Sequence, residues 1–142
     1  MNLVIDTNVA LSGMLWSGPP HLLLEWARRN IVNLIVSEKT INEFKRVINH
    51  KRFADRLKAI QSTPEEIIVY YINLAQFVPD PKSIPMVIPE DPFDNIFLVL
   101  AAEYNTRLVI SGDRHLLNIG KYQGIHIIMP SEACQIIEAL LI

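Results

Sequence analysis

Cysteine is nearly absent from this chain of 142 residues: Cys134 stands alone, so no disulfide can form within the chain. Long hydrophobic runs are also missing. The longest, from Ile96 to Ala102, is far short of the roughly 20 residues that cross a bilayer. The start does not resemble a secretory leader, because a carboxylate already stands at Asp6. These absences predict a protein of the reducing cytoplasm with no membrane span.

Neither sign of charge dominates, since 13 Lys and Arg stand against 15 Asp and Glu. Half of the residues are hydrophobic, which at this length predicts one compact domain over residues 1–142. The charges are nevertheless segregated: residues 28–58 carry nine basic and three acidic side chains. This distribution favours a cationic surface that attracts a polyanion.

Short apolar runs of strand type alternate with helical segments. The strands are expected at 3–5, 34–36, 86–88, 108–110 and 125–129, and helices with polar caps or proline starts lie between them. Ser37, Thr63 and Ser131 are the expected caps of three helices. The apolar end of the chain, residues 139–142, is expected to pack on the core or, failing that, at a dimer contact. The alternation predicts βαβ crossovers and therefore an α/β fold with a parallel sheet.

Carboxylates recur near the ends of these strands. Asp6 and Asp113 follow two of the strands closely, Glu43 lies on the helix after the second strand, and Asp91 and Asp94 open the helix after the third. In an open parallel sheet, side chains at the carboxyl ends of the strands meet at one edge. Each acid taken singly has a local explanation, a helix cap, a turn or, for Glu43, the flank of an apolar helix stripe, but their repetition indicates a shared site.

Several ionised carboxylates in one crevice need a counter-charge, because two unit charges about 4 Å apart repel by about 4 kcal/mol at an effective dielectric near 20. Oxygen ligands are those that Mg²⁺ and Mn²⁺ prefer, and the four histidines lack a paired zinc-ligand spacing. Such a cation neutralises phosphate charge and activates water. The pattern therefore favours phosphodiester hydrolysis. The nearby basic side chains that would attract an RNA backbone are Lys39, Lys45, Arg46, Lys51 and Arg52.

Four motifs occur in an order and spacing that resemble PIN domains, specifically the PIN-type toxins of VapBC-like toxin–antitoxin modules. They are Val4–Val9 with its Asp-Thr-Asn, Ser37–Glu43, Glu90–Phe97, and Val109–Asp113 with its Ser-Gly-Asp. One such motif alone would be weak, whereas the set of four extends over nearly the whole chain. Relatives commonly have a further acid where Phe93 stands and a lysine where Ile96 stands.

The resemblance implies a three-layer α/β/α fold with a central, mainly parallel sheet of about five strands. It implies a Mg²⁺- or Mn²⁺-dependent endoribonuclease that leaves a 5′-phosphate and a 3′-hydroxyl, and a homodimer inhibited by a small antitoxin. The residues that it assigns are Asp6, Glu43, Asp94 and Asp113 as the catalytic and metal-binding quartet, with Asn8, Ser111 and Asp91 in support.

Two other functions remain open. A PIN-fold nuclease that processes RNA outside toxin–antitoxin systems would carry the same acids, and so would an RNA-binding module that keeps the fold without turnover. Metal-dependent cleavage of single-stranded RNA separates the enzyme from the binding module.

Overall fold

The computed structural model describes the backbone of residues 1–82 and 92–142 and the side chains of residues 1–82 and 95–142. Its elements in chain order are β1 (Asn2–Ile5), α1 (Thr7–Leu15), α2 (Pro19–Arg28), β2 (Asn33–Val36), α3 (Glu38–Ile48), the 3₁₀ turn η1 (Lys51–Phe53), α4 (Ala54–Ala59), α5 (Pro64–Leu74), β3 (Gln76–Phe77), α6 (Pro92–Glu103), β4 (Leu108–Ile110), α7 (Arg114–Ile119), β5 (Lys121–Tyr122), β6 (Ile125–Ile128) and α8 (Pro130–Leu140).

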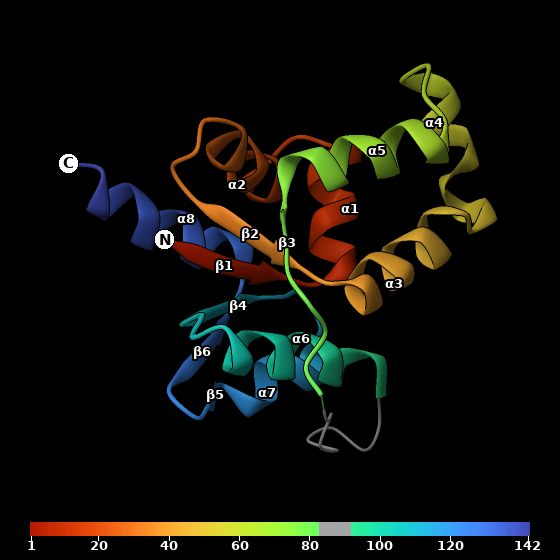
Figure 1. Ribbon diagram of the computed structural model, residues 1–142. Helices are drawn as coiled ribbons and strands as arrows, with labels where there is room; N and C mark the ends of the chain where they lie inside the picture. The colour runs from red at the N-terminus through yellow and green to blue at the C-terminus, as the bar shows by residue number, and fades with distance from the viewer. Residues whose placement is uncertain (83–91) are drawn as a thin grey trace.

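The described strands form one sheet in the order β3-β2-β1-β4-β6-β5, and all neighbours are parallel except β5 and β6 (Figure 1). At the centre, Ile5 of β1 is in register with Ile110 of β4, so these two strands end side by side. The α/β class and the parallel sheet are confirmed. In the described residues the sheet has six strands: four of the five expected, together with β3 and β5 of two residues each. The strand expected at 86–88 lies outside the described residues.

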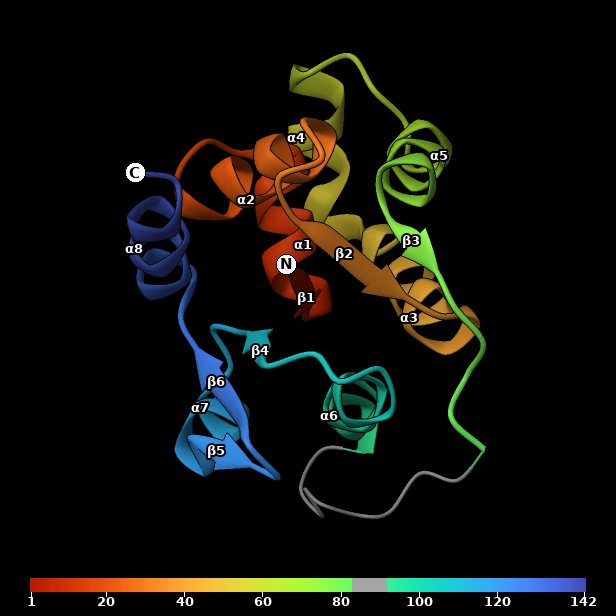
Figure 2. The ribbon, with the colours of Figure 1, turned by 60° about the vertical axis from the view of Figure 1, so that its left-hand side comes forward.

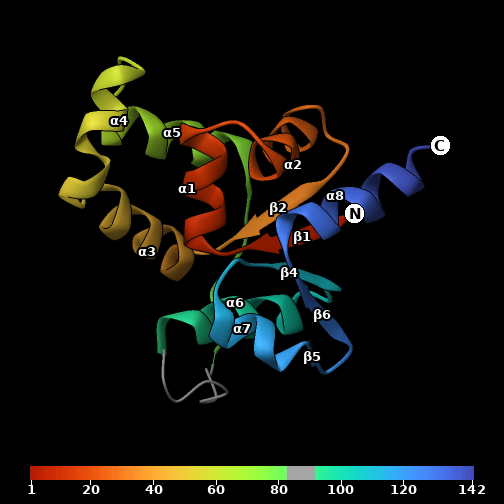
Figure 3. The same cartoon turned by 180° about the vertical axis from the view of Figure 1, so that it is seen from behind.

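Helices cover both faces of the sheet (Figures 2 and 3). One face packs against α1, α2, α3, α5 and α8, through a cluster that includes Leu3 and Ile110 from the strands. The other face packs against α6 and α7, through Val4 and Val109. Adjacent strand residues therefore point into different clusters, as the two-residue period of a strand requires. The three-layer architecture is confirmed.

Local sequence explains where the helices begin. The Ser37 hydroxyl accepts from the Thr40 N–H at the start of α3, and the Thr63 hydroxyl accepts from the Glu66 N–H at the start of α5. Both expected caps are thus confirmed. Ser131 is not a cap, because α8 already begins at Pro130, where the missing N–H costs nothing.

The apolar end of the chain differs from the expectation. Ala133, Cys134 and Ile137 bury one side of α8 in the cluster that it shares with α2, but Leu140 and Ile142 lie beyond that contact and are exposed. In the single chain this end is therefore not part of the core. No helix in residues 1–82 or 92–142 is long and apolar enough to cross a membrane.

A glycine fixes the close approach of α1 and α2. A Cβ added at Gly13 would lie 2.6 Å from Leu24 Cδ1 and 2.7 Å from the Pro20 carbonyl oxygen. The oxygen belongs to the backbone and cannot rotate away. We expect Gly13→Ala to lower the free energy of unfolding by about 2 kcal/mol, within the usual cost of overpacking. Gly112→Ala is the control for urea denaturation, because its added Cβ meets nothing within 4 Å; equal stability of both variants would contradict this packing.

Candidate active site

The site begins where the two central strands end. Asp6 directly follows β1 and Ser111 directly follows β4, and the Asp6 N–H donates to the Ile110 carbonyl at 3.0 Å. The Ser111 hydroxyl donates to Asp6 Oδ2, across 105 positions of sequence. The Ser111 oxygen also accepts from the Asp113 N–H at 2.9 Å. The parallel pairing of β1 with β4 thus brings the first and last predicted motifs together.

Asp6 is a helix cap as well as a member of this cluster. Its Oδ1 accepts from the Val9 N–H at 2.8 Å, and only 3% of the residue is exposed. Burial raises the pKa of Asp6 from 3.8 to about 6, and the charge of Asp113 also raises it, while the hydrogen bonds from Ser111 and Val9 act in the opposite direction. No salt bridge to Asp6 occurs within residues 1–82 and 95–142. Its ionised form is therefore costly in the free protein.

Asp113 also has two roles. Its Oδ1 accepts from the His115 N–H at 2.8 Å and from the Leu116 N–H at 3.3 Å, and so caps α7. The helix cap that offers a local explanation for Asp6 is thus present, and Asp113, for which a turn was the local explanation, is also a helix cap. Capping does not account for their proximity, because each cap needs one acid at its own helix and neither needs the other.

Glu43 lies on α3 with 10% of its side chain exposed. Arg46 donates to both of its carboxylate oxygens, from Nη2 at 2.6 Å and from Nε at 3.1 Å. The fork geometry of this pair is that of a bidentate salt bridge one helical turn apart. Arg46, expected to face RNA, thus also neutralises an acid of the predicted quartet.

The supporting residue Asn8 lies on α1, exposed to solvent, two residues after Asp6. Its Oδ1 accepts from Arg52 Nη2 at 3.5 Å. The guanidinium of Arg52 also stacks over the Phe53 ring, with its Cζ atom 4.7 Å from the ring centroid. The basic residues predicted to bind RNA all lie exposed on α3 or η1: Lys39, Lys45, Arg46, Lys51 and Arg52.

The remaining acids of the prediction fall on α6 or before it. Asp94 belongs to the first turn of α6, which packs against β1, β4 and α3, but its side chain and the whole of Asp91 lie outside the described residues. Among the side chains that the structure describes, no three of His, Cys, Asp and Glu are grouped closely enough to hold a metal ion. Asp6, Ser111 and Asp113 are the part of the predicted site that the structure brings together.

Two residues near Asp6 had no role in the sequence analysis. The Thr7 hydroxyl is buried without a hydrogen-bond partner in the described structure. Tyr71 of α5 is buried with its ring 4.6 Å from that of Phe44, and burial raises the pKa of its phenol, with a further contribution from the charge of Asp6. Nothing in the pattern of α5 distinguishes Tyr71 from an ordinary core aromatic, so only the fold reveals its proximity to Asp6.

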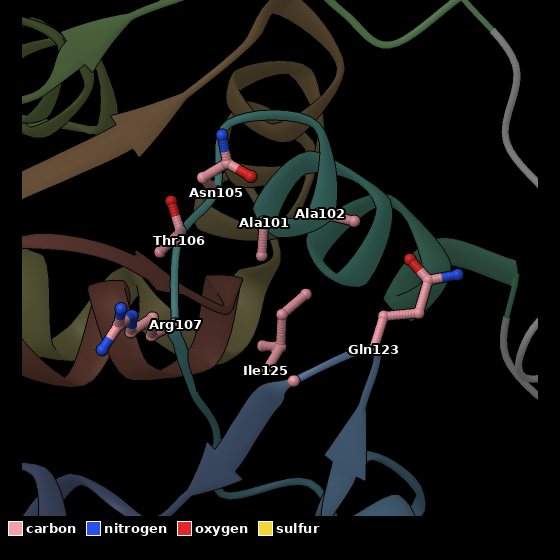
Figure 4. A pocket seen from close by; sticks show the side chains of 8 residues that line it. Ala101, Ala102, Asn105, Thr106, Arg107, Gln123 and Ile125 are labelled. Atoms are coloured by element: carbon pink, nitrogen blue, oxygen red, sulfur yellow. The ribbon is translucent and has the colours of Figure 1, made fainter.

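A separate hollow of about 550 Å³ lies at the opposite end of the sheet, between the end of α6 and the β5–β6 turn (Figure 4). The carboxamides of Asn105 and Gln123 flank the apolar side chains of Ala101 and Ile125. None of the described residues that line it has a carboxylate. Since Arg107 before β4 lines the hollow and Ser111 after β4 belongs to the acid cluster, the strand separates the two.

Comparison with known proteins supports the assignment made from the motifs. Residues 2–115 match the family model of the PIN domain. Comparison with curated proteins gives no match. The fold is similar to a chain in the crystal structure of VapBC2 from Rickettsia felis bound to a DNA fragment from their promoter, with a TM-score of 0.60, 9% identity, and coverage of 89% of this chain and 97% of that chain. The family match spans more than half of the sequence and includes Asp6, Glu43, Asp94 and Asp113, and the chain therefore belongs to the PIN domain family.

Proposed function

We propose that this protein is a Mg²⁺- or Mn²⁺-dependent endoribonuclease that hydrolyses single-stranded RNA, with Asp6, Glu43, Asp94 and Asp113 as its acidic quartet. PIN domains are in general nucleases, and the chain belongs to that family. The observation that carries the proposal is the contact of Asp6 with Ser111, and of Ser111 with Asp113, at the carboxyl ends of β1 and β4. Polar groups gathered there are in the usual position for a functional site of a parallel sheet.

A divalent cation fits the donors at this edge. Asp6 is buried beside a second carboxylate, and its pKa of about 6 shows that its hydrogen bonds do not offset the cost of burying the ionised form. The Thr7 hydroxyl next to it is also buried without a partner. All donors are oxygens, as Mg²⁺ and Mn²⁺ prefer. When bound, the ion supplies neutralisation of the phosphate and a water of lowered pKa.

The residues of the chain then have separable roles. Asp6 and Asp94 would be the main metal ligands, and Glu43 and Asp113 would complete the set and orient the attacking water. Ser111 holds Asp6 by a hydrogen bond and accepts one from the backbone of Asp113, and so links the carboxylate of one acid to the backbone of the other. Asn8 and the basic residues around Arg52 would hold the RNA backbone.

The biological role that we propose is that of a toxin in a toxin–antitoxin pair, active in the cytoplasm as a homodimer and inhibited by a small antitoxin. The likeness to a chain of VapBC2 supports this role, as do the four motifs. A PIN nuclease that processes RNA outside such pairs is the second candidate, since the same acids serve both. Co-expression with the product of a short adjacent gene distinguishes them: relief of growth arrest favours the toxin.

The test of the enzyme is cleavage of a labelled single-stranded RNA by the purified chain. We expect cutting with Mg²⁺ or Mn²⁺, and none in excess chelator, because the acids alone neither neutralise the phosphate nor activate water. Readdition of Mn²⁺ to the chelated sample should restore cutting. Cleavage that continues at the same rate in chelator would refute the metal dependence, and RNA binding without any cleavage would favour the non-catalytic module.

A further inference from the structure

A groove of about 380 Å³ opens where the end of α3, η1, α4 and the start of α5 meet, in the arm at the upper right of Figure 1. Its apolar lining includes Ile48, Ala54, Leu57 and Pro64. Ile48 and Leu57 are core residues with exposures of 1% and 5%. The groove is therefore built on the packed part of the arm.

The polar lining of this groove contains two cations among neutral groups, which are Asn49, His50, Ser62 and Thr63. Lys51 and Lys58 line it together with His50. The Nδ1 atom of His50 accepts from the Arg52 N–H at 3.1 Å, which leaves Nε2 of the ring to donate to another group. Three acids adjoin this lining in sequence, Asp55 in the first turn of α4 and Glu65 and Glu66 in the first turn of α5, and none of them is among the lining residues. Glu66 Oε1 lies 3.4 Å from the Thr63 hydroxyl.

A single turn joins the groove to the acid edge of the sheet. Lys51 lines the groove, and the next residue, Arg52, reaches Asn8 at 3.5 Å. Consecutive Cα atoms are about 3.8 Å apart, so the backbone passes directly from a residue of the groove to a residue that contacts α1. Asn8 in turn lies two residues from Asp6.

We propose that this groove binds an unpaired base of the RNA strand, whose phosphates run along Lys51 and Arg52 to the acid edge. The inference rests on the proposed nuclease function, which it deepens with a second contact point for the substrate. An apolar lining suits the face of a base, and ammonium and guanidinium groups suit the adjoining phosphates. Cations lie both at the groove and beside Asn8, and this arrangement suits the repeated charge of a phosphate backbone better than an acidic protein segment.

The experiment measures RNA affinity without cleavage. In the Asp6→Asn protein, fluorescence anisotropy follows binding of a fluorescein-labelled oligouridine of about 12 nucleotides, a length that single-strand sites commonly span. Ala54 is exposed at the start of α4, so Ala54→Trp fills the groove at a position that tolerates bulk. We expect Ala54→Trp and Lys51→Ala each to raise the Kd about fivefold to tenfold. Lys121→Ala, on the exposed edge strand β5, is the control for loss of one charge, and its Kd should not change.

Photocrosslinking gives an independent readout. A strand with 4-thiouridine should crosslink to peptides from residues 48–64, and Ala54→Trp should abolish those crosslinks. Unchanged affinity of Ala54→Trp, or crosslinks confined to other parts of the chain, would overturn the groove assignment even in a chain that cleaves RNA. Binding of an acidic peptide in place of the RNA strand would overturn it equally. Failure of the whole chain to bind RNA would instead overturn the proposed function.

Discussion

The Asp6→Asn variant is expected to lose RNA cleavage by about 1000-fold while keeping its fold. The carboxamide retains an acceptor for the Val9 N–H, and Asn caps helices as well as Asp does. It removes the charge that would hold a divalent cation, and loss of about 4 kcal/mol of transition-state stabilisation corresponds to a rate effect of that size. Initial rates of cleavage under saturating Mn²⁺, with circular dichroism of both proteins, make the measurement.

The other three acids provide the comparison within the quartet. Asp94→Asn should lose as much activity as Asp6→Asn, and Glu43→Gln and Asp113→Asn should also be severely impaired. Asp55→Asn is the matched control, because Asp55 is an exposed carboxylate on α4, away from the strand ends. If Asp6→Asn cut RNA as fast as the original chain, the assignment of Asp6 to the reaction would be wrong.

The metal-free protein should lose up to about 3 kcal/mol of stability between pH 4 and pH 6. Burial raises the pKa of Asp6 from 3.8 to about 6. A raised carboxyl pKa means that the folded chain holds the proton more tightly than the unfolded chain. The contribution of Asp6 is therefore complete below pH 3.8 and is lost as pH rises through about 6, and two pKa units correspond to about 3 kcal/mol.

Urea denaturation in chelator at several pH values tests this linkage. Asp6→Asn cannot ionise, so its stability should exceed that of the original chain at pH 7, and the difference should vanish near pH 3.5. Asp55→Asn is again the control, because its free energy of unfolding shows the effect of removing one exposed negative charge. An Asp6→Asn variant that is less stable than the original chain by the same amount at both pH values would show that Asp6 is a structural cap and nothing more.

The motifs and the class of the fold follow from the sequence because they depend on local patterns. Apolar runs such as Leu3–Ile5 and Leu108–Ile110 predict strands by composition, and side chains that follow parallel strands must lie at one edge of the sheet. The juxtaposition of Asp6 with Asp113 was thus predictable. The caps at Ser37 and Thr63 follow from their own short-range patterns.

Other features depend on partners distant in the sequence and were not predictable. The strands β3 and β5 have two residues each, and they form because β2 and β6 offer open edges beside them. The bond from Ser111 to Asp6 requires the register of β4 on β1. Glu43 and an RNA phosphate would compete for the Arg46 guanidinium. The spacing of the two residues alone does not decide which of these partners Arg46 binds.

Direct binding of Mn²⁺, followed by electron paramagnetic resonance of the free ion, tests the central claim without reference to activity. The mechanism predicts that the original chain removes Mn²⁺ from solution and that Asp6→Asn, Glu43→Gln, Asp94→Asn and Asp113→Asn each bind it more weakly, whereas Asp55→Asn does not differ. Retention of full Mn²⁺ affinity by all four quartet variants would contradict the claim that these acids share one metal site.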